Sequence, residues 1–162
     1  MASSSGPKRA FVTSVKYKAN AVRSVCQGVA DSQSLGGTWK PWLSGFAMTG
    51  TGGQTSAIGR IQSSGPWRLL TGEVVFRNRG QLATQPETAI RVTETKSMVP
   101  VNEYAWTGTV LGGTESGHDC MGWSQGSLSF DATVGNPNSI QAWTDSAVES
   151  CDKSLHVYCL ED

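Results

Sequence analysis

The residues with the clearest chemistry in this chain are its four cysteines, Cys26, Cys120, Cys151 and Cys159. They form no Cys-x-x-Cys pair, and the histidines are His118 and His156, so a zinc site built on closely spaced ligands is poorly supported. An even number of cysteines at long spacings is typical of two disulfides, which form in an oxidising compartment. This predicts an extracellular, periplasmic or cell-surface protein. The alternative is four buried thiols in a cytosolic one.

The spacing leaves the disulfide pairing open, because four cysteines allow three connectivities. Cys159 lies in the strand-like run 154–160, and Cys151 lies just before that run. Two cysteines on a short strand and its lead-in pair only across a tight turn. The remaining options join Cys26 to Cys120 or to Cys159.

A catalytic interpretation would rest on His118 and Asp119, which directly precede Cys120. A cysteine held in a disulfide is not a nucleophile, because the thiolate is the reactive form. His156 lies next to Val157 in a predicted strand, where we expect a surface or edge residue rather than a catalytic base. The chain has no Gly-x-Ser-x-Gly elbow, phosphate-binding loop or dinucleotide fingerprint. We therefore expect that the protein is not an enzyme.

Four oxygen-bearing residues of the second half are candidate ligand-binding residues and candidate calcium ligands: Asp131, Asn136, Asn138 and Asp145. Calcium takes six to eight oxygen ligands, mostly carboxylates and carbonyls. The alternative is turn chemistry, because Asn136-Pro137-Asn138 is by itself a good turn signal. We expect no cofactor and keep calcium as the alternative.

Aromatic and basic residues supply further candidate contacts. Five of the six tryptophans lie in strand-like segments near cysteines and are expected in the core. Trp67 follows a Ser-Ser-Gly-Pro run and is the candidate for an exposed ligand contact, with a core position as the alternative. Lys16, Lys18 and Arg23 suit sulfated glycans or acidic partners. Ordinary solvated surface is the alternative for these three.

Net charge is zero, so bulk electrostatics does not indicate nucleic acid as a partner. Residues 1–81 carry ten Lys and Arg and two acids, whereas residues 82–162 carry three and eleven. This asymmetry indicates either a charged binding face or two halves whose charges mix in space. No run approaches the ~18 apolar residues of a membrane span.

The chain is predicted to form one loop-rich α+β domain over residues 10–162, after a disordered lead or expression scar at residues 1–9. Its 38% hydrophobic and 16% charged residues are typical of a folded protein, and its 19 glycines gather in turn-like clusters. We expect strands at 11–15, 89–95, 104–110, 142–144 and 155–160, and a hairpin at 67–76. A helix should begin with Asn20 as its N-cap and end at 35–37, and a second should lie within 55–61. Residues 124–139 are expected to form a loop.

Four segments in register with the cysteines carry a family resemblance: 22–44, 69–76, 105–109 with 120–123, and 150–161. Together they resemble the C-type-lectin-like superfamily, closest to its endostatin-like branch and to bacterial surface proteins of that type. The resemblance implies two short helices packed on small antiparallel sheets with a long loop region. It also implies disulfides between the first and fourth cysteines, Cys26–Cys159, and between the second and third, Cys120–Cys151.

The sequence departs from the sugar-binding members of this superfamily. Their Glu-Pro-Asn or Gln-Pro-Asp loop precedes the second cysteine, whereas Asn136-Pro137-Asn138 follows Cys120 here. Thr144 stands where their Trp-Asn-Asp strand has a calcium-binding amide. The N-terminal histidines of endostatin's zinc site are absent, since no histidine precedes His118.

These observations lead us to expect a secreted or surface adhesion module that binds a glycan or an extracellular protein. Recognition would use the loops between Cys120 and Cys151, on a scaffold held by two disulfides. The alternatives are a calcium-dependent carbohydrate-binding lectin and a structural tip or capping domain of a larger surface assembly. The sequence leaves the oligomeric state open.

Overall fold

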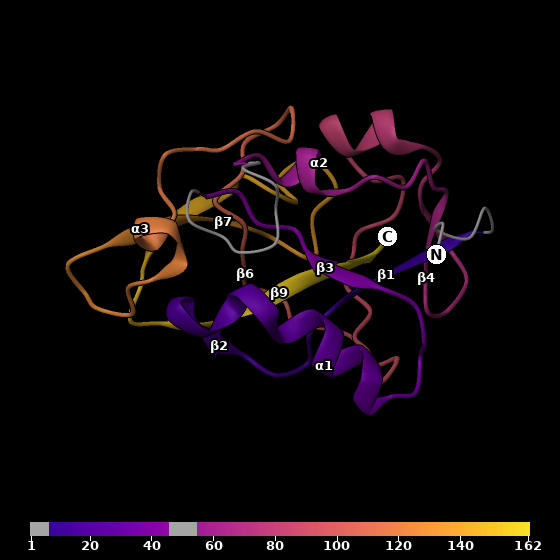
Figure 1. The fold of residues 1–162 in the computed structure, drawn as a ribbon, viewed down its shortest axis with the longest axis horizontal. Helices are drawn as coiled ribbons and strands as arrows, with labels where there is room; N and C mark the ends of the chain where they lie inside the picture. Colours follow the sequence, from indigo (N-terminus) through magenta and orange to yellow (C-terminus); the bar gives the residue numbers. More distant parts are fainter. Residues whose placement is uncertain (1–6, 46–54) are drawn as a thin grey trace.

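The computed structural model describes residues 7–45 and 55–162 and has a mixed α+β architecture (Figure 1). The nine strands are β1 (Lys8–Val12), β2 (Tyr17–Lys18), β3 (Trp39–Pro41), β4 (Trp67–Leu69), β5 (Val74–Phe76), β6 (Ala105–Trp106), β7 (Asp131–Gly135), β8 (Ala147–Ser150) and β9 (Ser154–Glu161). The helical elements are η1 (Ala19–Ser24), α1 (Val25–Ser32), α2 (Ala57–Arg60), η2 (Arg79–Ala83) and α3 (Cys120–Trp123).

Strand β9 is the centre of the sheet, whose order is β5-β4-β1-β9-β6-β7-β8. It pairs antiparallel with β1, β2 and β3 and parallel with β6. Figure 1 shows it running through the middle of the molecule. The expected small antiparallel sheets are therefore wrong: the described strands form one larger sheet, and β1–β4 and β6–β9 pair in parallel.

The alternation of side chains along β9 divides the core between the two faces of the sheet. Tyr158 and Leu160 belong to one buried cluster, which also contains Trp42. Val157 and Cys159 belong to the other, on the side of α1. A strand covered on both faces carries apolar residues at successive positions, so β9 reads as an almost continuous apolar run.

The first predicted helix forms, but in two parts. A 3₁₀ segment, η1, leads into α1, and Asn20 lies inside η1 rather than capping it. The helical spacing of Val22, Val25, Cys26 and Val29 predicts that Cys26 faces the core, and Cys26 is buried, together with Ala30, on the inner face of α1. The first left-handed residue after α1 is Ser34, with φ 53°, two residues before Gly36.

Several predicted strands differ from the structure. The hairpin of β4 and β5 is confirmed, whereas 89–95 forms only isolated bridges and 142–144 forms no strand. The expected loop at 124–139 contains β7, whose last four residues are all buried. Strand β1 begins at Lys8, so Lys8 and Arg9 belong to the sheet and not to the expected lead. Residues 1–6 of that lead lie outside the described residues.

Both disulfides implied by the family resemblance are present. Cys26 of α1 is joined to Cys159 of β9, and Cys120 is joined to Cys151 in the β8–β9 turn. Their sequence separations are 133 and 31 residues. The first therefore ties the N-terminal helix to the last strand, and the second closes the chain around β7 and β8.

We expect the longer disulfide to contribute more to stability, since its loop restricts the unfolded chain more. The chain-entropy model gives about 5 kcal/mol for the Cys26–Cys159 loop and about 3.7 kcal/mol for the Cys120–Cys151 loop. Denaturant unfolding of the two Cys→Ser double variants measures this difference. Equal losses would show that loop closure is not the main contribution.

Ion pairs join the basic first half of the chain to the acidic second half. Arg9 pairs with Glu161, Lys16 with Glu103, Lys40 with Asp162, and Arg77 with Glu87. Strands from both halves interleave in one sheet, so at these four pairs the charges of the two halves are mixed. No helix within residues 7–45 and 55–162 combines the length and apolar character that a membrane crossing requires.

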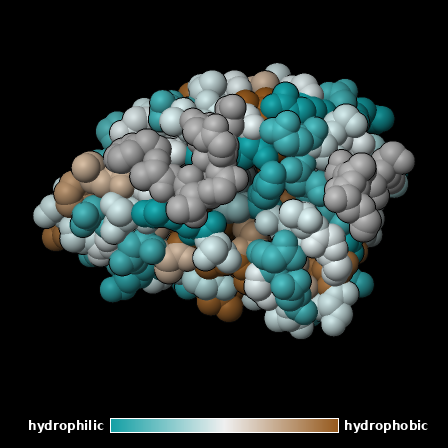
Figure 2. Space-filling view, in the orientation of Figure 1, coloured by the Kyte–Doolittle hydropathy of each residue, from teal (hydrophilic) through white to brown (hydrophobic). Residues whose placement is uncertain are grey.

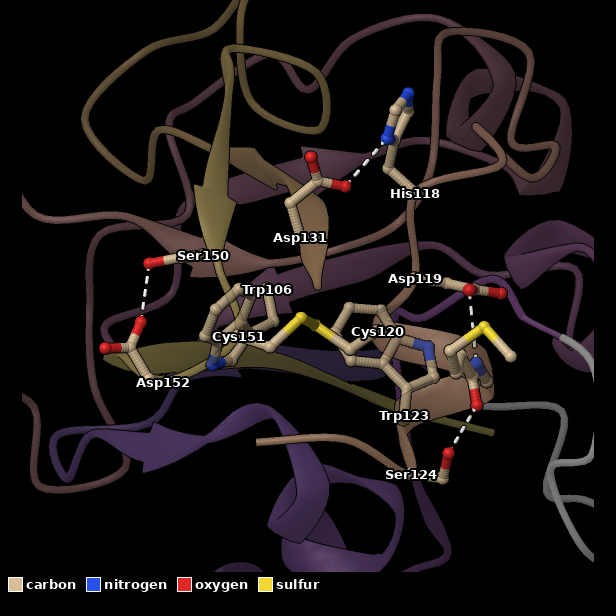
Figure 3. The surroundings of a disulfide bond; sticks show 12 residues. Trp106, His118, Asp119, Cys120, Trp123, Ser124, Asp131, Ser150, Cys151 and Asp152 are labelled. Atoms are coloured by element: carbon tan, nitrogen blue, oxygen red, sulfur yellow. Dashed lines mark hydrogen bonds and ion pairs between the residues drawn. A yellow bond between two sulfur atoms is a disulfide. The ribbon is translucent and has the colours of Figure 1, made fainter. Parts of the chain in front are cut away.

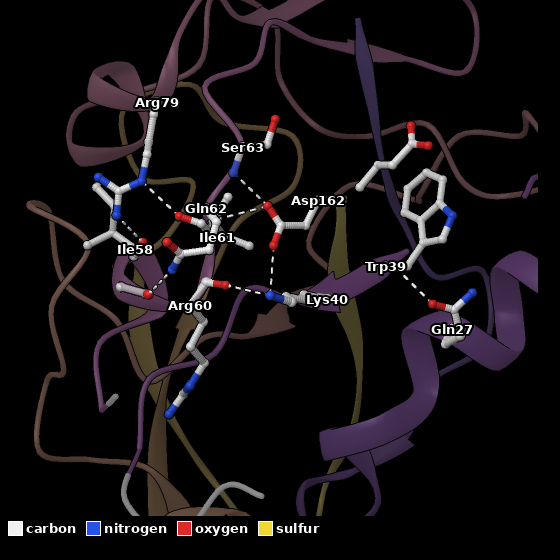
Figure 4. Close-up of polar contacts among 12 residues, drawn as sticks. Gln27, Trp39, Lys40, Ile58, Arg60, Ile61, Gln62, Ser63, Arg79 and Asp162 are labelled. Carbon is white, nitrogen blue, oxygen red and sulfur yellow. Dashed lines mark hydrogen bonds and ion pairs between the residues drawn. The ribbon is translucent and has the colours of Figure 1, made fainter. Parts of the chain in front are cut away.

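Asp162 fastens the end of β9 to the chain around it (Figure 4). One carboxylate oxygen lies 2.7 Å from Lys40 Nζ, and the other accepts hydrogen bonds from the amides of Gln62 and Ser63. Burial opposes ionisation, but these bonds outweigh it and lower the pKa of Asp162. The charged carboxylate therefore stabilises the fold above the ordinary aspartate pKa of about 3.9.

Replacing Asp162 by Asn should reduce stability near pH 7 by about 1 kcal/mol, because the Lys40 contact loses its charge. The difference from wild type should persist down to about pH 4 and disappear as the pH falls through the lowered folded pKa. Urea unfolding at several pH values measures it. A difference that stays constant down to pH 2 would contradict the assignment.

Candidate functional site

The segment after Asp119 is a left-handed turn, α3, fixed by the disulfide to Cys151 (Figure 3). Cys120, Met121, Gly122 and Trp123 all have positive φ, from 53° to 68°. These residues belong to one of the four segments that carry the family resemblance. The Asp119 carboxylate accepts a hydrogen bond from the Gly122 amide, and the Trp123 indole donates one to the carbonyl of Ser44.

This turn is strained, since a left-handed conformation costs roughly 1–2 kcal/mol for each residue other than glycine. Three of its four residues are not glycine. The disulfide and the fully buried Trp123 hold it in place, and Met121 remains 49% exposed. Trp123 connects α3 to Ser44 through its indole and to Arg23 through its carbonyl. The disulfide connects α3 to the β8–β9 turn.

His118 and Asp131 point toward each other above this disulfide in Figure 3. Their Nδ1 and Oδ1 atoms are 2.8 Å apart, and both side chains are about half exposed. Because Cys120 is disulfide-bonded, the free thiol that a Cys/His nucleophile requires is absent. The contact joins the loop before α3 to the start of β7.

The candidate calcium ligands do not converge. Asp131 and Asn136 flank the length of β7, five residues apart, which is about 16 Å along a strand. Two ligands of one calcium ion lie within about 5 Å of each other, so this set does not form a single site. The Asn136 side chain instead accepts a hydrogen bond from the Asn138 amide, which confirms the turn alternative. Among the described residues, no group of three or more His, Cys, Asp and Glu is placed to hold a metal.

Trp67 is fully buried, so its expected role as an exposed contact is wrong. Along β4, Trp67 and Leu69 face the core, while Arg68 faces solvent. The Trp67 indole donates a hydrogen bond to the carbonyl of Glu161 and packs edge-on against Phe76. The core alternative is the correct one.

The three candidate basic residues have different surroundings. Lys16 lies 3.9 Å from Glu103, and Lys18 is exposed on β2. The Arg23 guanidinium donates to the carbonyl of Trp123, 3.3 Å away, and so supports the left-handed turn. Their use as a sulfated-glycan site stays a prediction.

His156 is 2% exposed, so the expected surface or edge position is wrong. Its Nδ1 lies 2.6 Å from the carbonyl of Thr13 and its Nε2 lies 2.6 Å from a Glu103 carboxylate oxygen. Both ring nitrogens thus lie within hydrogen-bond distance of an oxygen atom. His156 therefore links β9 to the segment that follows β1 and to the segment that precedes β6.

A recess in the predicted ligand-binding region lies between two loops, and we call it the loop groove. It has a volume of about 450 Å³ and is lined by residues 87–89 and 91 on one side and 138–141 on the other. The Glu87 carboxylate is paired with Arg77. The side chains of Arg91 and Gln141 form no hydrogen bond or ion pair to another described residue. Their donors are available to a ligand.

Hydrogen bonds hold both walls of the loop groove in place. The Asn138 side-chain amide lies 3.2 Å from the carbonyls of Val99 and Pro100. The indole of the buried Trp143 donates to the carbonyl of Thr84, which links the two loops. The sequence predicted Asn138 as a binding residue but missed Glu87, Arg91 and Gln141. No sequence motif marks these three residues as a set, because they come together only in the tertiary structure.

Comparison of the whole chain with protein-family models and with curated proteins finds no match.

Replacing Asn138 by Ala should lower stability by about 1 kcal/mol, because it leaves the Val99 and Pro100 carbonyls without their donor. Hydrogen exchange should quicken in the loops around residues 99–101 and 136–142 and stay unchanged in β9. Hydrogen-exchange mass spectrometry of the oxidised protein measures this. Unchanged exchange in both loops would show that Asn138 does not tie them.

Proposed function

We propose that this protein is an extracellular, disulfide-stabilised binding module that recognises a glycan through the loop groove. One observation carries the proposal: the side-chain donors of Arg91 and Gln141, which bond to no other described residue, line the same recess. Sugar hydroxyls and carboxylates accept hydrogen bonds from guanidinium and amide groups. An extracellular protein with polar groups of the same kind is the alternative ligand.

The rigid support of the groove favours recognition. Binding sites commonly lie on loops that a rigid scaffold positions. Here Trp143 and Asn138 fix both walls, so little ordering is left for the ligand to impose. Figure 2 shows the face of Figure 1 as mostly hydrophilic and neutral, with scattered hydrophobic patches.

We further propose that the chain has a C-type-lectin-like fold of the endostatin-like kind. Three features support this: β1 and β9 are antiparallel neighbours, Cys26 is joined to Cys159, and Cys120 is joined to Cys151. The proposed recognition does not use calcium, because the candidate calcium ligands are spread along β7 and beyond it. The two disulfides also support secretion or surface display.

A glycan array with the oxidised protein tests this function. We expect a polar or acidic glycan to bind, and EDTA to leave binding unchanged. Arg91→Ala and Gln141→Ala should each weaken binding about tenfold, because each variant loses one or two hydrogen bonds to the glycan.

The matched control is Arg68→Ala, which removes an exposed arginine from β4, outside the groove. It should bind as wild type does. An array without any bound glycan, or equal losses for Arg68→Ala and Arg91→Ala, would contradict the proposal.

A further inference from the structure

Helix α1 contains a glycine that the fold does not require. Gly28 lies in the interior of α1, is exposed, and has no positive φ. A Cβ added there would meet no atom within 4 Å. Glycine inside a helix destabilises it relative to alanine, so neither turn geometry nor close packing explains this residue. Its effect is to leave the space above it open.

That space is a groove along α1, which we call the helix groove. It has a volume of about 400 Å³ and includes Val25, Gly28 and Val29 of α1, with Val15 and Tyr17 from the opposite segment. Val15 is 56% exposed although it is apolar. The groove extends from Ser24 to Ser32, which is about 12 Å of helix and matches three to four residues of extended chain.

A buried carboxylate lies in this apolar setting. Glu94 is 8% exposed and also lines the helix groove. It accepts hydrogen bonds from the Ser14 amide, at 2.7 Å, and from the Ser14 hydroxyl. None of the ion pairs among the described residues involves Glu94. Ser14 donates one hydrogen bond to each of its oxygens, so each oxygen retains a second lone pair. Buried charges are usually paired, so this site is complementary to a cation.

The surroundings of Tyr17 are consistent with negative potential in the groove. Burial, and then the charge of Glu94, raise the pKa of the Tyr17 phenol. The ring of a tyrosine also attracts cations. The carboxylate and the aromatic ring therefore favour the same kind of ligand.

We propose that the helix groove binds a lysine or arginine side chain presented on an extended segment of a partner protein. The aliphatic stem of that side chain would pack on Val25 and Val29, and its charged head would lie at Glu94 and Tyr17. A free amine would fill only part of a groove two helical turns long, so the occupant is a peptide. This site shares no residue with the loop groove.

The test titrates the oxidised protein with the peptide Ac-Ala-Val-Lys-Val-Ala-NH₂ and follows backbone amide shifts by NMR. The matched peptide has norleucine in place of lysine, which keeps the stem and removes the charge. We expect saturable shifts at residues 15–17, 24–32 and 94 with the lysine peptide, and at least tenfold weaker binding of the norleucine peptide.

Two variants make the result decisive. Gly28→Leu places a side chain in the groove from a position where an added Cβ meets no atom within 4 Å. It should abolish binding while raising the melting temperature by about 2–4 °C. Glu94→Gln removes the charge and should weaken binding about tenfold, whereas Arg91→Ala should not change it. Lack of binding, equal binding of the two peptides, or unchanged binding to a folded Gly28→Leu variant would each overturn the proposal.

Discussion

The structure depends on the burial of β9 along its whole length. Seven of its eight residues are buried, and β1, β2, β3 and β6 all pair with it. Strand β9 therefore brings together elements that are distant in sequence, with β1 on one side of it and β6 on the other. The Cys26–Cys159 disulfide attaches α1 to the same strand, and Asp162 fastens its end to β3 and the segment after α2. The N-terminal strands and helix are thus anchored to the C-terminal strand.

A scaffold held this firmly permits strain and unfavourable residues at its surface. The left-handed turn at α3 persists because Cys120 is covalently fixed and Trp123 is buried. Gly28 is tolerated because α1 is anchored by Cys26 and Ala30 rather than by its own helix propensity. The loop groove and the helix groove both lie against elements that β9 or a disulfide holds, which is where preorganised binding is least costly.

Local patterns predicted those features that depend on neighbouring residues. The periodicity of α1 placed Cys26 in the core, and the turn between β4 and β5 placed the hairpin. The same reasoning failed where a long-range contact decides the outcome. Trp67 could be assigned to the core only once β4 was known to lie between β1 and β5. His156 was expected at a surface, but β9 carries it beneath Thr13 and Glu103.

The sequence by itself determined that four cysteines at long spacings would form two disulfides, that the run ending at Leu160 would be a strand, and that Asn136-Pro137-Asn138 would turn. Each follows from residue chemistry or local periodicity. Only the tertiary structure decided that residues 87–91 meet 138–141, that Glu94 reaches the groove beside Gly28, and that the candidate calcium ligands stay apart. These outcomes depend on distances in space, and those are set by how distant segments pair with β9 and its neighbours.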